Sequence, residues 1–320
     1  IGEPDAMNSS ERRWIQVQKT LNPQSGPHVE RVGLAKEMES WVYPLHFIDF
    51  ETSAVALPFN TGRHPYEQVA FQFSHHICYS DGTIEHASEY INTTPGKFPN
   101  FEFVSALKKA LEKDEGTIFR FATHENSILN SIKDQLEDSN YSDKHNLIDF
   151  IKTITTPRKD DPNPWVASRP MVDLRVVILD YYYNSLTKGS NSIKAVLPAV
   201  LNSCDFLKNK YTNPISKINI TSLNFEGHHT WIKFKDQQVI NPYSLLPPIF
   251  IEQSQEQLDQ FISGLDKISD GGAALTAYSK LQFVDMSDEE RDSIKRSLLK
   301  YCELDTLAMV MIYEHLKTLI

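Results

Sequence analysis

The segment LHFIDFE, residues 45–51, is a nearly continuous apolar run that carries two acids. A run of this length and character is typical of a β-strand that is buried on both faces. Residues two apart in a strand point to the same face, so Asp49 and Glu51 project together. Two carboxylates at this spacing repel each other, and a divalent cation relieves the repulsion because hard ions such as Mg²⁺ prefer carboxylate oxygen. The segment therefore predicts a central strand that contributes ligands to a metal site.

The residues around this strand predict a mixed sheet. Segments 67–79 and 83–92 are separated by a turn sequence and read as two further strands, which gives three antiparallel strands in a row. Helical spacing follows over 103–114, then a short strand over 116–121, and then a helix for which Thr123 is the expected N-cap. We therefore expect an α/β fold in which a mixed sheet is flanked by helices.

A long helix is predicted near the C-terminus. Ser287 and Glu290 match the capping box that starts a helix. One stripe of this helix then recurs every three to four residues, through Ile294, Leu298, Tyr301, Asp305, Ala308 and Ile312. Asp305 is an acid on a stripe that should face the core, and a buried carboxylate is costly unless a partner or a metal neutralises it.

A further acid is expected at the rim of the sheet, where open α/β sites usually lie. Glu125 in ATHENS is at the start of a helix that follows a short strand, and Asp173 in MVDL is the competing candidate. We favour Glu125 for this position. Four carboxylates, from Asp49, Glu51, Asp305 and this acid, together with two divalent ions would be nearly neutral.

The chain divides into segments of different character. Residues 1–42 are polar, and we expect a loose lead-in with one short helix there. Residues 43–320 are expected to form a single domain. Within it, 156–170 holds four prolines and resembles an insertion, and 202–285 is an extra segment without clear signals.

Composition limits the classes of function. The chain has 320 residues and a net charge of −10, from 32 basic and 42 acidic residues. This balance argues against a non-specific nucleic-acid coat, which is usually basic, but not against an acidic site that recruits divalent metals. There is no apolar run of about 18 residues, so we expect no membrane partner.

The cysteines and the N-terminal sequence bear on location. Three scattered cysteines favour a reducing cytoplasm over a disulfide framework, and no signal peptide is visible. The sequence starts at Ile1 rather than Met, so we expect a trimmed chain or a piece of a longer polypeptide, with an upstream domain or partner protein outside it.

The ordered set of motifs resembles the DEDD superfamily of DnaQ-like 3′–5′ exonucleases. DFE (49–51) resembles its first motif, Asp-x-Glu, and YCELD (301–305) resembles the third motif of its tyrosine branch, Tyr-x-x-x-Asp. The chain is also similar to an uncharacterised bacterial family of that superfamily through PLHFIDFET, HPYEQVAFQFSHH, GSNSIKAVLP and YCELDTLAMV. The similarity runs from about Tyr43 to Leu316. One departure is Glu125, because the second motif usually supplies Asp.

The resemblance implies a ribonuclease H-like fold for residues 43–320 and a two-metal mechanism. Two Mg²⁺ or Mn²⁺ ions about 3.5–4 Å apart would clamp the scissile phosphate of a nucleic-acid 3′ end, either DNA or RNA. Asp49 would bridge both ions, Glu51 and Asp305 would hold one and Glu125 the other. Tyr301 would orient the attacking water, or accept its proton. The products would be nucleoside 5′-monophosphates.

The sequence also predicts contacts with the substrate and leaves two rival functions open. The expected substrate-binding residues are Thr52, Arg63, Gln72 and Lys194, and Lys194 could equally be a surface lysine at a capped helix start. One rival is an inactive exonuclease fold that binds nucleic acid or protein. Another is a nuclease for short oligonucleotides, which the acidic net charge keeps open.

Overall fold

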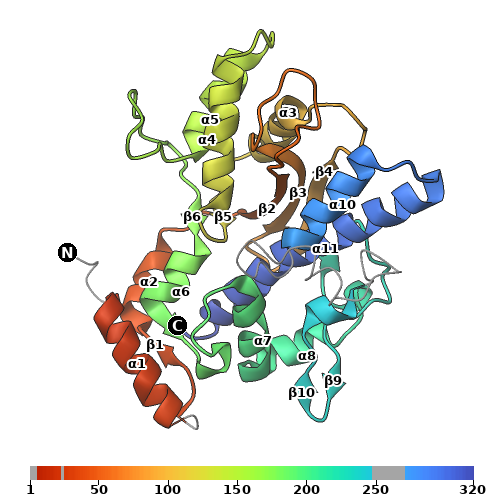
Figure 1. Ribbon diagram of the computed structural model, residues 1–320. Coiled ribbons are helices and arrows are strands. Elements are labelled where there is room, and N and C mark those ends of the chain that lie inside the picture. The colour runs from red at the N-terminus through yellow and green to blue at the C-terminus, as the bar shows by residue number, and fades with distance from the viewer. Residues whose placement is uncertain (1–5, 23–24, 247–270) are drawn as a thin grey trace.

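The computed structural model describes residues 6–22, 25–246 and 271–320, and a six-stranded mixed sheet forms its centre (Figure 1). The strand order is β6-β5-β2-β3-β4-β8. Strands β2, β3 and β4 are antiparallel, β5 and β6 continue parallel to β2, and β8 is parallel to β4. The strands are β2 (Leu45–Ser53), β3 (Val69–Cys78), β4 (Ile84–Ile91), β5 (Ile118–Arg120), β6 (Val172–Asp173) and β8 (Ile220–Thr221). The predicted mixed α/β architecture is confirmed.

Strand β2 is central because it is apolar on both faces. Ile48 and Phe50 pack on one side into a core formed with the helices α3 (Asn100–Leu111), α4 (His124–Glu137) and α5 (Lys144–Ile154). Leu45 and Phe47 pack on the other side into the core around α11 (Asp288–Lys317). The two-residue period of the strand therefore turns Asp49 and Glu51 toward α11.

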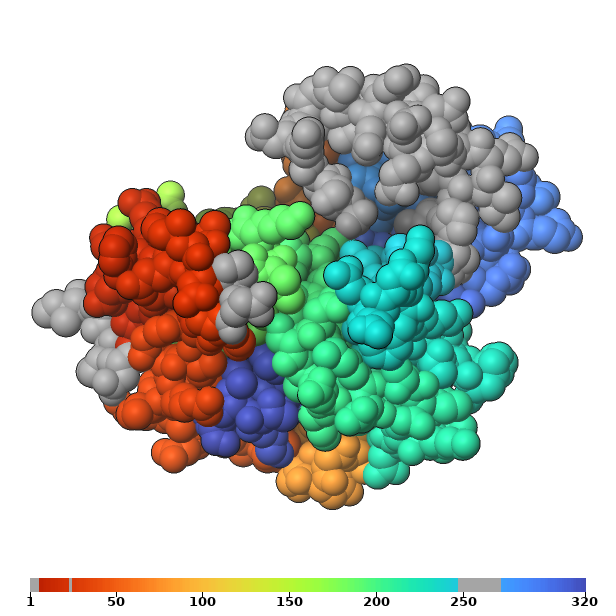
Figure 2. Space-filling model, turned by 90° about the horizontal axis from the view of Figure 1, so that it is seen from below, coloured from red at the N-terminus to blue at the C-terminus, as the bar shows by residue number. Residues whose placement is uncertain are grey.

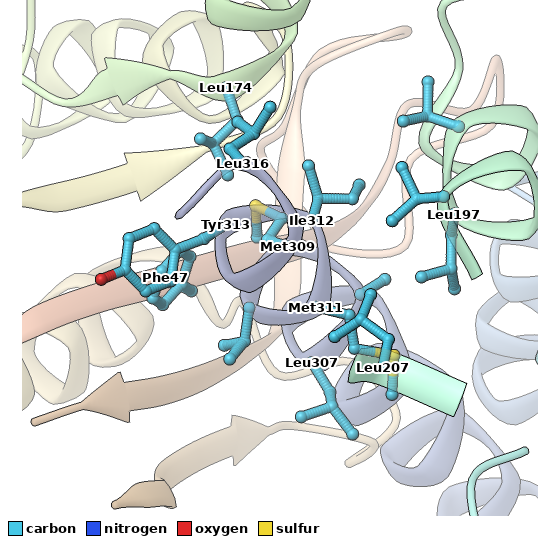
Figure 3. Packing of buried hydrophobic residues seen from close by; sticks show 14 of the residues in the cluster. Phe47, Leu174, Leu197, Leu207, Leu307, Met309, Met311, Ile312, Tyr313 and Leu316 are labelled. Carbon is cyan, nitrogen blue, oxygen red and sulfur yellow. The ribbon is translucent and has the colours of Figure 1, made fainter. Parts of the chain in front are cut away.

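Helix α11 begins at the predicted capping box, with Ser287 as the N-cap and Glu290 returning the hydrogen bond. Every residue from 301 to 313 is buried, so the single apolar stripe expected from the sequence is too narrow a description. The sheet covers one side, and α7 (Ile193–Ser203) and α8 (Asp205–Tyr211) cover another. Figure 3 shows Phe47 beside Tyr313, with ring centroids 5.9 Å apart, and the α11 side chains extending in several directions around the helix axis.

The N-terminal residues are more ordered than predicted. Two helices, α1 (Ser9–Leu21) and α2 (Arg31–Glu39), replace the expected loose segment with one short helix. Strand β1 (His28–Val29) pairs with β7 (Tyr182–Tyr183), which follows α6 (Leu174–Tyr181). Figure 2 shows the end of α11 (dark blue) at the surface between these N-terminal elements and the green α7 region.

For residues 6–22 and 25–42 the prediction was wrong, because a few anchors in a polar sequence hold their helices on the rest of the fold. The buried Arg12 guanidinium donates hydrogen bonds to the carbonyls of Ile178, Leu179 and Tyr182. Leu34 is completely buried in the core around α11.

The predicted insertion at 156–170 and the extra segment at 202–285 differ in structure. Residues 156–170 contain neither helix nor strand. The segment 202–285 contributes β8 to the sheet, and its residues 247–270 lie outside the described part of the chain. Its other described elements are α8, η3 (Ile215–Lys217), β9 (Phe234–Lys235), β10 (Gln238–Val239), η4 (Pro242–Leu245) and α10 (Gly271–Phe283). None of the helices within the described ranges combines the length and apolar character that crossing a bilayer requires.

Gly116 sets how closely β5 approaches the start of β2, and it gives a test of the fold. A Cβ at Gly116 would lie 1.8 Å from the backbone oxygen of Pro44, which the main chain cannot absorb without moving. We expect Gly116→Ala to lower the free energy of unfolding by about 1–3 kcal/mol or more, measured by chemical denaturation. The exposed Gly227 is the matched control, because its added Cβ would meet Ser216 at an ordinary 3.4 Å. Equal stabilities of the two alanine variants would contradict this packing.

Candidate functional site

Three of the predicted acids meet between β2 and α11. Asp49 and Glu51 come from β2 and Asp305 from α11, and one carboxylate oxygen from each lies within 4.8 Å of the other two. Glu51 and Asp305 are buried and Asp49 is partly buried. The Cys302 thiol donates to the backbone oxygen of Asp49 at 3.6 Å, which joins the strand to the helix at this point. Packing of β2 against α11 therefore assembles a carboxylate cluster.

Glu125 is a fourth acid, outside the group that converges within 4.8 Å but near enough for its charge to affect Asp49. It is 2% exposed in the first turn of α4, and its Oε2 atom has no hydrogen-bond partner among the described residues. Its negative charge acts on Asp49, and the charge of Asp305 acts on Glu125. Thr123 precedes the helix as predicted, but its side chain makes no capping hydrogen bond, which corrects the N-cap role expected for it.

Burial and mutual repulsion change the protonation of these acids. Burial, followed by the charges of Asp305, Glu125 and Glu51, raises the pKa of Asp49 well above its ordinary value, against the opposing effect of Lys194. Burial also raises the pKa of Glu125 from 4.5 to about 8. Without a cation, burial and the neighbouring negative charges therefore favour the protonated forms of Asp49 and Glu125.

Asp173 forms a hydrogen bond and an ion pair that fix the turn before α4. Its Oδ1 accepts from the Ala122 N–H at 2.9 Å and caps α6, and its Oδ2 pairs with Arg120 at 2.9 Å. Ala122 has a φ of 70°, a left-handed conformation that costs a non-glycine residue about 1–2 kcal/mol. Arg120 also donates to the Ala122 carbonyl. The contacts of Asp173 and Arg120 thus hold the strained turn that leads to Glu125.

Two tyrosines and a lysine border the cluster. Lys194, in the first turn of α7, donates to the Tyr301 hydroxyl, and its Nζ lies 4.8 Å from the Tyr301 ring centroid and 5.3 Å from that of Tyr243. The Tyr243 hydroxyl donates to Asp305 Oδ1 at 2.5 Å. Tyr243 was missed from the sequence, because it is an isolated aromatic residue in a segment without periodicity.

The other expected substrate-binding residues lie in different surroundings. Thr52 is the last residue but one of β2, and its hydroxyl is 3.1 Å from His124 Nε2. Arg63 pairs with Glu67 at 3.1 Å and lies 3.5 Å over the Phe98 ring. The role predicted for Gln72 is corrected, because its side chain is completely buried and donates to the Leu298 carbonyl at 2.9 Å. Gln72 anchors α11, and substrate has no access to it.

Buried polar contacts fix α11 on the sheet close to Asp305. Thr306 Oγ1 lies 2.8 Å from Ser74 Oγ and 2.7 Å from His76 Nδ1, both on β3. Glu303 pairs with His86 of β4 at 3.1 Å, and both side chains are fully buried. A shift of α11 along its axis would leave several of these groups unpaired, so they specify one position for Asp305.

Comparison with known families covers the first part of this site. Residues 46–192 match the model of a domain of unknown function, DUF2779. The matched range includes Asp49, Glu51 and Glu125, and ends before α7 and α11, which supply Lys194 and Asp305. No curated protein and no solved structure matches the chain.

The raised pKa of Glu125 gives a pH test in the presence of a chelator. The folded chain keeps this proton up to about pH 8, whereas the unfolded chain releases it near pH 4.5, so the contribution of Glu125 to stability falls as pH rises through this window. Glu125→Gln does not titrate. We expect its free energy of unfolding to match that of the parent near pH 4.5 and to exceed it at pH 8, measured by urea denaturation.

The exposed Glu115→Gln serves as the control for that measurement, and should follow the parent across the whole range. A Glu125→Gln variant that is less stable than the parent at pH 8 would mean that the ionised carboxylate has a stabilising partner.

Proposed function

We propose that this chain is a metal-dependent 3′–5′ exonuclease of the DEDD superfamily, with a ribonuclease H-like fold. The observation that carries the proposal is the meeting of Asp49, Glu51 and Asp305, distant in sequence, within 4.8 Å. The order of three antiparallel strands followed by parallel ones agrees with that fold. The family match assigns no activity, so the proposal rests on the site and on the motifs.

The chemistry of the donors fits hard divalent cations. All four acids offer oxygen, which Mg²⁺ and Mn²⁺ prefer, and the site brings together more negative charge than Lys194 alone offsets. The Oε2 of the buried Glu125 has no partner in the part of the chain that the structure describes, which is a second indication, because buried carboxylate oxygens normally have one. Asp49, Glu51 and Asp305 would hold the cations from one side and Glu125 from another.

Bound Mg²⁺ or Mn²⁺ would supply activation of water and stabilisation of charge on the phosphate. The chain's own groups would orient the reactants. Lys194 has hydrogen-bond donors only, so the Tyr301 oxygen must be the acceptor of their contact. Lys194 also places a positive charge beside Asp49, where it would attract a non-bridging phosphate oxygen. The hydrolysis would release nucleoside 5′-monophosphates from a single-stranded 3′ end.

Release of mononucleotides tests the proposal. A 5′-labelled single strand should be shortened stepwise from its 3′ end with Mg²⁺ or Mn²⁺ and left intact in chelator. Asp49→Asn and Asp305→Asn should each lose at least about a hundredfold in rate. Asp292→Asn is the matched control, since Asp292 is an exposed acid of the same helix α11.

Two other outcomes separate the rival functions. Binding of the strand without cleavage, unchanged in Asp49→Asn, would favour an inactive binding module and contradict the proposal. Faster cleavage of strands two to five nucleotides long than of long ones would keep the chemistry and change the substrate class.

Metal binding should also be visible in stability. A cation that binds only the folded chain at a hundred times its Kd stabilises it by about 2.7 kcal/mol. We expect Mn²⁺ to raise the Tm of the parent and to leave that of Asp305→Asn nearly unchanged. In chelator the variant should melt at or above the parent, because one of several repelling charges has gone. Unfolding of Asp305→Asn in chelator would instead give Asp305 a structural role.

A further inference from the structure

Tyr243 reaches the carboxylate cluster from outside the elements that supply the acids. It lies in the short helix η4, where Asn241 Oδ1 accepts from the Tyr243 N–H at 3.2 Å, and the neighbouring Pro242 is buried. The ring packs against the core around α11. Local hydrogen bonding and packing therefore hold this side chain in place.

The hydroxyl of Tyr243 is directed at one acid. It donates to Asp305 Oδ1 at 2.5 Å, and the Tyr243 ring is tilted at 49° to that of Tyr301 with centroids 5.7 Å apart. A phenol that donates to one oxygen restricts rotation of the carboxylate about its last bond. A carboxylate has about four acceptor positions, so this hydrogen bond is compatible with a cation on the same group.

The two tyrosines differ in their partners. Tyr301 accepts from Lys194, whereas Tyr243 donates to Asp305. The partner of Tyr301 is a lysine ammonium group, and the partner of Tyr243 is a carboxylate of the predicted metal site. Loss of the Tyr243 hydroxyl should therefore alter the binding of metal, and loss of the Tyr301 hydroxyl should alter the reaction.

We propose that Tyr243 is a positioning residue that orients Asp305 for binding of a divalent cation, so that the short helix η4 completes the site. This inference rests on the proposed function for the role of Asp305, but it concerns metal affinity rather than turnover. Partners that orient a metal ligand typically contribute ten- to a hundredfold in affinity.

The test is a titration of the whole chain with Mn²⁺, followed by electron paramagnetic resonance, for the parent and three phenylalanine variants. We expect Tyr243→Phe to bind Mn²⁺ about ten- to a hundredfold more weakly, with a Tm in chelator close to the parent's. Tyr301→Phe should keep the parent's Mn²⁺ affinity. Tyr278→Phe is the matched control, because the buried Tyr278 hydroxyl has no partner among the described residues.

Rate measurements add a second readout. Saturating Mn²⁺ should restore most of the cleavage rate of Tyr243→Phe and little of that of Tyr301→Phe. A Mn²⁺ affinity of Tyr243→Phe within twofold of the parent, while Asp305→Asn loses binding, overturns the inference and leaves the metal site standing. A parent that binds no Mn²⁺ overturns both. A parent that binds Mn²⁺ without cutting nucleic acid overturns only the exonuclease, and the affinity of Tyr243→Phe still decides the role of Tyr243.

Discussion

The packing of α11 across β2 is the contact on which the site depends. It buries a strand face and a helix that each carry acids, and it brings Asp49, Glu51 and Asp305 within 4.8 Å. Folding of the apolar surroundings forces this approach, because the same strand face buries Leu45 and Phe47 against α11. Hydrophobic packing thus holds the carboxylates together although they repel each other. Lys194 offsets part of their repulsion through its positive charge.

Contacts on either side of the cluster restrict how it can relax. Thr306 and Glu303, which lie on either side of Asp305 in the sequence, bond to residues of the sheet. Gln72 holds the preceding part of α11 through the Leu298 carbonyl. On the opposite side, Asp173 and Arg120 hold the left-handed turn at Ala122. Backbone strain of this kind persists only when its surroundings over-determine it. The acids therefore cannot move apart easily, and protonation or cation binding must relieve their repulsion.

Much of the fold followed from local patterns. The apolar run at 45–51 indicated the central strand, the two segments after it gave the antiparallel neighbours, and the Ser287 capping box gave the start of α11. The N-terminal helices were missed because their few anchors, such as Arg12, bond to carbonyls more than 160 residues away. Gln72 was assigned to substrate because it follows the first strand, and the sequence does not record that it bonds to α11.

The sequence by itself determined which side chains share a face. Two-residue spacing in β2 paired Asp49 with Glu51, and four-residue spacing in α11 paired Tyr301 with Asp305. Only the tertiary structure decided that these pairs meet, and that the charge of Glu125 acts on Asp49. It also decided that Asp173 bonds to the turn at Ala122 and that Tyr243 bonds to Asp305. The physical reason is that spacing along a strand or helix is set by local backbone geometry. The approach of distant segments is set by how their apolar faces pack, and no local period records it.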